Sequence, residues 1–145
     1  MKAMTNTVMD RCGAPDDLWF LAMQHCVFIL NRLSHALLKN KCPIEACFGT
    51  TPDISAILCF YFYQVVLCCT PDKATFPKSR EARGRFVGFA EPIGDALTFL
   101  ILTDDTKQII CRSNVRSVLN EKERNLHVDL FGGEDAFISQ ANCSL

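Results

Sequence analysis

The sequence lacks an apolar run long enough for a membrane span and an apolar leader of the secretory kind. These two absences argue against a membrane-spanning protein and against a secreted one. The most apolar stretches, residues 18–30 and 54–69, are shorter than the about 20 residues that a helix needs to cross a bilayer. Polar residues also interrupt them, at Gln24, His25 and Gln64. The first ten residues are polar and do not form the core of a secretory signal. We therefore expect an intracellular protein without membrane contact.

Cysteine is abundant, but the spacing typical of metal sites is missing. None of the nine cysteines forms a Cys-x-x-Cys pair, and most lie in apolar runs, where free cysteine packs as a small hydrophobic residue. We expect reduced thiols, no metal and no cofactor. An alternative, a thiol-dependent enzyme using Cys68 or Cys69, requires a lowered thiol pKa and a nearby base. The neighbouring sequence offers Lys73 but no histidine.

The chain also has almost no net charge, which favours no class of partner. With 145 residues, 49% of them hydrophobic, and a formal charge of −1, it has room for one ordinary domain or a small module with an appendage.

Helical signals dominate the first third of the chain. Residues 2–12 predict a helix that ends at Gly13, and a second helix runs from about Pro15 to Leu33. Residues 43–48 predict a short helix with proline at its first position and a glycine after its end. The second helix is apolar nearly all round, so it requires neighbours on more than one side.

Strand signals follow after Pro52. Residues 58–69 are aromatic, β-branched or otherwise apolar on both alternating faces, which predicts a buried strand. Shorter strands are expected at residues 85–90, 97–102, 108–112 and 115–119, separated by turn residues. Five short strands with tight turns suggest a small barrel, and residues 120–145 read as a linker or frayed tail.

A set of short motifs resembles the copia-type (Ty1/copia) retrotransposon integrase in order and spacing. The motifs are Leu18-Trp19, Ile29-Leu30-Asn31-Arg32-Leu33, Pro43-Ile44-Glu45-Ala46, Phe48-Gly49-Thr50-Thr51-Pro52-Asp53 and Gly84-Arg85-Phe86-Val87-Gly88-Phe89. The resemblance implies an α+β chain: a helical C-terminal remnant of the RNase H-like catalytic core at residues 1–50, then an SH3-like β-barrel at residues 54–119. One departure is Cys42, which stands where the family usually has a threonine.

The same resemblance implies that the chain catalyses nothing. The family's catalytic Asp, Asp and Glu, which hold divalent metal ions, would all precede Met1, so no catalytic or metal residue is carried over. The chain would be a fragment of a Pol polyprotein with an ancestral role in DNA integration, and nuclear if it follows the parent integrase. Carboxylate pairs are present at Asp16-Asp17 and Asp104-Asp105, where a helix start and a turn favour Asp for structural reasons.

A cluster of cations carries most of the functional content. It consists of Lys73, Lys78, Arg80, Arg83 and Arg85, and the second hairpin would extend it if it places Lys107, Arg112 and Arg116 on the same side. Each cation that meets a phosphate adds salt-dependent, sequence-independent affinity, so we expect weak, non-specific nucleic-acid binding. The alternative is a solvated loop on a structural or protein-interaction relic.

Two further expectations concern aromatic and apolar residues. Tyr61 and Tyr63, two apart on one strand, are candidates for base stacking, although core packing is the favoured interpretation for both. Without the sheet that it evolved to cover, the helix from Leu18 to Leu33 would expose an apolar patch and promote self-association. His25, beside Cys26, is expected to pack inside.

Overall fold

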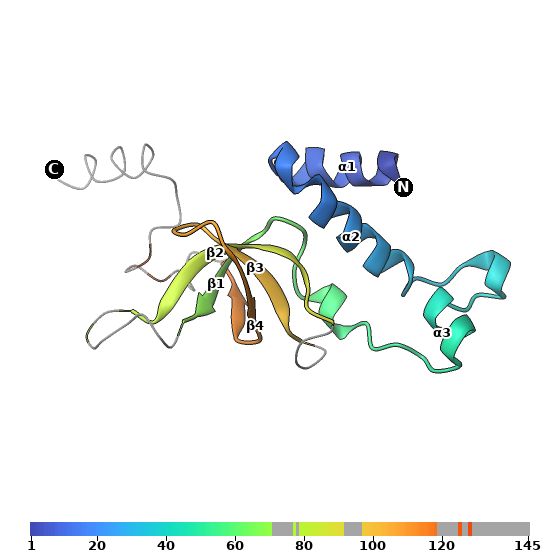
Figure 1. Ribbon diagram of the computed structural model, residues 1–145. Helices are drawn as coiled ribbons and strands as arrows, with labels where there is room; N and C mark the ends of the chain where they lie inside the picture. The colour runs from blue at the N-terminus through green and yellow to red at the C-terminus, as the bar shows by residue number, and fades with distance from the viewer. Residues whose placement is uncertain (71–76, 78, 92–96, 119–124, 126–127, 129–145) are drawn as a thin grey trace, which may run out of the picture.

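The computed structural model describes residues 1–70, 77, 79–91, 97–118, 125 and 128. Helices precede an antiparallel sheet, as expected for an α+β chain, and α1 and α2 lie to one side of the strands (Figure 1). The elements are α1 (Lys2–Cys12), η1 (Asp16–Leu18), α2 (Trp19–Leu30), η2 (Ala36–Leu38), α3 (Pro43–Phe48), η3 (Ser55–Leu58), β1 (Val65–Cys69), β2 (Glu81–Phe89), β3 (Phe99–Thr103), β4 (Ile109–Arg112) and β5 (Val115–Ser117).

Local capping residues fix the ends of α1 and α3, which have the predicted bounds. Gly13, with φ of 65°, and Gly49, with φ of 73°, take the left-handed conformation that ends a helix. At the start of α3, the Cys42 thiol accepts a hydrogen bond from the Glu45 N–H at 3.4 Å. Cys42 therefore caps the helix in the way that the expected threonine would.

The second helix is shorter than predicted, because α2 ends at Leu30 and not at Leu33. Beyond Leu30 the chain winds more tightly: the Arg32 N–H donates to the Ile29 carbonyl at 3.0 Å, a three-residue spacing. The Arg32 guanidinium lies 3.5 Å from the centre of the Phe28 ring and pairs with Glu91. These contacts hold residues 31–33 as a turn.

The predicted strand at residues 58–69 is also wrong in its first half, since β1 begins only at Val65. Asp53 accepts hydrogen bonds from the Ser55 N–H at 2.9 Å and from the Ser55 hydroxyl at 2.6 Å, which starts the 3-10 turn η3. Tyr63 then has a φ of 63°, in the left-handed region that a strand cannot contain. Apolar composition alone does not reveal these two turns.

The sheet has the strand order β4-β3-β2-β1-β5, so four consecutive strands form a meander and β5 returns to pair with β1. Only residues 113 and 114 join β4 to β5, a span of at most about 11 Å. In a flat sheet these two edge strands would lie about 19 Å apart. The sheet is therefore strongly curled, although no pairing between β4 and β5 closes it in the described part of the chain.

Two apolar clusters lie on opposite faces of the curled sheet. The inner cluster centres on Phe86 and Ile101, both fully buried, with Val66, Cys68 and Phe99. The outer cluster joins Val87 of β2 to Met9 of α1 and Ala22 of α2. Phe86 and Val87 serve opposite clusters because consecutive residues of a strand point to opposite faces. A bulge between Phe86 and Gly88 then brings Phe89 to the same side as Phe86.

Candidate nucleic-acid interface

Three arginines of the predicted cluster share the outer face of the sheet. In the register, Leu67 of β1 is paired with Arg83 of β2 on one side and with Arg116 of β5 on the other. Arg85 lies two residues from Arg83 and so points to the same face, opposite the buried Phe86. Arg83 and Arg116 are two strand spacings apart, about 10 Å, and Arg85 is about 7 Å further along β2. We call Arg83, Arg85 and Arg116 the arginine row.

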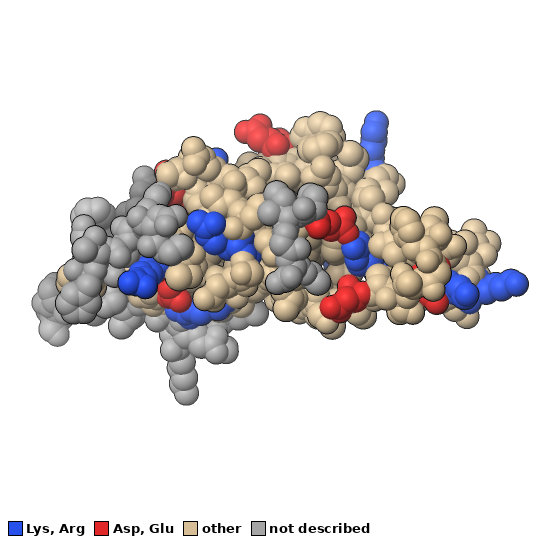
Figure 2. Space-filling view, turned by 60° about the horizontal axis from the view of Figure 1, so that its bottom comes forward, with Lys and Arg blue, Asp and Glu red and all other residues tan. Residues whose placement is uncertain are grey.

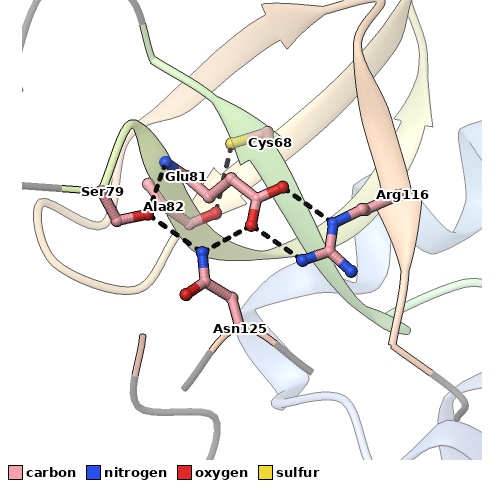
Figure 3. Close-up of polar contacts among 6 residues, drawn as sticks. All are labelled: Cys68, Ser79, Glu81, Ala82, Arg116 and Asn125. Atoms are coloured by element: carbon pink, nitrogen blue, oxygen red, sulfur yellow. Dashed lines mark hydrogen bonds and ion pairs between the residues drawn. The ribbon is translucent and has the colours of Figure 1, made fainter. Parts of the chain in front are cut away.

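Arg116 of the arginine row forms an ion pair with Glu81. Its Nε and one terminal nitrogen donate to the two carboxylate oxygens of Glu81, at 2.7 and 2.8 Å (Figure 3). The Asn125 amide donates to the same carboxylate at 2.6 Å and to the Ser79 hydroxyl at 2.9 Å. The bond from Arg116, followed by that from Asn125, holds the pKa of Glu81 below its usual range against the opposing effect of burial.

Arg83 carries a second and more enclosed ion pair, with Asp104 at the end of β3. Both side chains are only 16% exposed, and the Asp104 N–H also donates to the Arg83 carbonyl at 3.4 Å. Two of the three arginines in the row are thus already matched to a carboxylate of this chain.

The third arginine, Arg85, stacks on an aromatic ring. Its guanidinium carbon lies 4.8 Å from the centre of the Tyr63 ring, a cation–π distance, and its Nε is buried without a hydrogen-bond partner among the described residues. Tyr61 is 56% exposed, whereas Tyr63 is half-buried. The expectation that both tyrosines lie on one face of a strand is wrong, because both precede β1 and Tyr63 is in a turn.

The other predicted cations do not extend the row. Arg112 faces the inner side of the sheet, since its register partner is the core residue Phe99 and its charge acts on the Cys68 thiol. Arg112 was expected to extend the cation cluster only if β4 placed it on the same side of the sheet, and β4 places it on the other side. Arg80 and Lys107 are exposed, just before β2 and in the β3–β4 turn, while Lys73 and Lys78 lie outside the described residues. On the face shown in Figure 2, Lys and Arg side chains alternate with acidic ones and form no continuous basic surface.

The remaining candidates have structural roles in the described part of the chain. Burial raises the pKa of the Cys68 thiol, the opposite of what a cysteine nucleophile requires. His25 is buried, as expected, and packs among Phe62, Phe86 and Phe89. No group of three His, Cys, Asp or Glu side chains gathers as a metal site would across the ranges described above.

Sequence reasoning missed the acidic partners of the arginine row. Asp104 was assigned to a turn, and it also pairs with Arg83, 21 positions away. Asn125 belongs to the segment expected to be a linker, yet it contacts Ser79 and Glu81. Strand register brings Asp104 to Arg83, whereas Asn125 follows β5 and belongs to no strand. No local signal in the sequence predicts either contact.

Comparisons of this chain with protein-family models, curated proteins and solved structures find no match. Within the described residues, no helix is both long and apolar enough to cross a membrane.

Proposed function

We propose that this chain is a non-catalytic fragment of a copia-type retrotransposon integrase whose SH3-like sheet contacts nucleic acid weakly and without sequence specificity. The observation that carries the proposal is the arginine row on the outer face of a small, curled sheet. Its ancestral role would be in DNA integration, and its location nuclear if it follows the parent integrase.

The order of the strands supports the SH3-like part of this proposal. The first four strands form a meander, a two-residue link joins β4 to β5, and β5 pairs with β1. This is the arrangement expected of a small SH3-like barrel. The helices support the other part of the proposal, the remnant of an integrase catalytic core. A remnant of an RNase H-like core would retain helices without the sheet that they once covered, and α2 leaves large apolar side chains exposed.

Phosphate groups are the chemical feature that the row fits. Arginine presents a planar fork of donors that matches a phosphate, and such contacts hold a nucleic acid without reading its bases. Each contact releases condensed counterions, so binding should weaken steeply as salt rises.

Binding to a labelled 20-base-pair duplex, measured by fluorescence anisotropy at about 50 and 200 mM salt, tests the proposal. The test variant is Arg85→Gln, which removes the member of the row that has no carboxylate partner among the described residues and so breaks no described ion pair. The matched control is Lys39→Gln, which removes the same charge next to η2, among the helical elements. Binding should be salt-sensitive, and its salt slope should fall by about one in the test variant only.

Absence of salt-sensitive binding by the folded chain would contradict the proposal, as would equal losses in both variants. The alternative function is a structural or protein-interaction relic without nucleic-acid binding. One observation favours it, because Arg83 and Arg116 already have carboxylate partners within the chain.

We also propose that the chain self-associates through α2. This helix packs Ala22 in one cluster with Val87 of β2 and also buries Cys26, whereas Trp19 is 56% exposed and Phe20 50% exposed. Exposed apolar side chains on one helix are typical of an interaction surface, and a second copy of the chain offers a surface of the same kind.

A further inference from the structure

The two carboxylates that pair with the arginine row occupy the positions that phosphates would take. Glu81 receives two parallel hydrogen bonds from Arg116, the geometry in which arginine also binds a phosphate. Asp104 lies against the Nε of Arg83. A nucleic acid that used either guanidinium would first have to displace the carboxylate.

We infer that Glu81 and Asp104 mask the row, so that phosphate and carboxylate compete for Arg116 and Arg83. This inference rests on the proposed nucleic-acid binding and adds its regulation. The outer face then carries three arginines against two carboxylates, and only Arg85 has no carboxylate partner among the described residues. Weak binding is the direct consequence.

The two pairs differ in how readily they open. The Glu81–Arg116 pair has side chains 29% and 38% exposed, so water and phosphate reach it directly. In the Arg83–Asp104 pair both side chains are 16% exposed, and the Asp104 backbone is bonded to Arg83 as well. Glu81 therefore masks Arg116, the more accessible of the two paired arginines, and Asp104 masks Arg83, the more enclosed one.

Removing either carboxylate charge should strengthen binding. A unit charge about 7 Å from a phosphate, screened as in water, changes affinity by about threefold. Each released guanidinium that meets a phosphate should also steepen the salt slope by about one. The same change at a carboxylate that does not pair with the row should have a smaller effect.

The experiment compares Asp104→Asn with Asp105→Asn, and Glu81→Gln with Glu91→Gln, using the anisotropy assay with the 20-base-pair duplex. Asp105 is the exposed neighbour of Asp104 and has no ion pair with Arg83, while Glu91 pairs with Arg32, away from the row. Asp104→Asn and Glu81→Gln should each bind about threefold more tightly, with a steeper salt slope. Far-UV circular dichroism and urea unfolding verify that each variant is folded, and Glu81→Gln, at the more exposed pair, carries the test if Asp104→Asn does not fold.

The outcomes separate the two claims. If the native chain binds but each test variant equals its control, masking is wrong and the proposed function stands. If neither the native chain nor any folded variant binds, both are wrong. If only the test variants bind, masking is supported, but the proposed function of the native chain is wrong.

Discussion

Lowering the pH from about 7 to about 4.5 should weaken the attachment of α2 to the sheet, because His25 lies where a charged ring is disfavoured. The His25 side chain stacks on the Phe89 ring at 5.4 Å and meets the Phe86 ring edge-on at 5.7 Å. The residue is 6% exposed, and its Nδ1 is buried without a hydrogen-bond partner in the described structure. Burial lowers the pKa of His25 from 6.5 to about 4.

This pKa sets both the sign and the size of the effect. The unfolded chain accepts a proton on His25 near pH 6.5, whereas the folded chain does so only near pH 4. The stability that neutral His25 provides is therefore complete above pH 6.5 and is lost as the pH falls toward 4. A difference of about 2.5 between the two pKa values corresponds to about 3 kcal/mol of unfolding free energy.

Urea unfolding followed by far-UV circular dichroism, at several pH values between about 7 and 4.5, measures this loss. His25→Phe replaces the ring with one that cannot be protonated, so its stability should change little over the same range. His25→Gln, which is uncharged and smaller, serves if phenylalanine overpacks the site. The reasoning is refuted if the native chain loses less than about 1 kcal/mol, or if the variants lose as much as the native chain.

Two further predictions concern packing and assembly. Gly84→Ala should destabilise the fold by about 1–3 kcal/mol in urea unfolding, because an added Cβ would lie 2.5 Å from Ile101 Cγ2 and 2.9 Å from the Leu102 carbonyl oxygen. Gly88→Ala, whose Cβ would meet only Leu100 Cδ1 at 3.5 Å, is the control, and an equal loss in both would contradict the steric argument. Phe20→Gln with Leu30→Gln should abolish concentration-dependent self-association in sedimentation and reduce binding of a hydrophobic dye, whereas Leu37→Gln, at an 88% exposed residue of η2, should not. A native chain that is monomeric and binds no dye would exclude assembly through α2.

Local chemistry explains why the helices were predicted better than the strands. Proline fixes its own φ and glycine readily takes a left-handed one, so beside a helical pattern Pro43 marks a helix start and Gly13 and Gly49 mark helix ends. The start of β1 depends instead on Asp53 bonding Ser55 and on Tyr63 adopting a positive φ. Aspartate, serine and tyrosine are common in other settings, and an apolar run does not indicate the Asp53 turn or the positive φ of Tyr63.

The arginine row shows a different limit of sequence reasoning. The cluster around Arg83 was visible because its members are close in the chain, but Arg116 joins it and Arg112 leaves it through register alone. A shift of one residue in strand pairing would exchange their faces. The acidic partners have the same origin, since Asp104 reaches Arg83 only across the β2–β3 pairing.

Stability and binding make opposite demands on Glu81 and Asp104. If the ion pairs served only the fold, neutralising either carboxylate would lower the free energy of unfolding by about 0–1 kcal/mol, the contribution of a partly exposed pair. Nucleic-acid binding would then change only as the net charge of the chain changes. If the row contacts phosphate, the same substitutions weaken the fold slightly and strengthen binding. Measuring unfolding and binding on the same four variants therefore separates a relic that keeps its arginines for the sheet from a module that keeps them for nucleic acid.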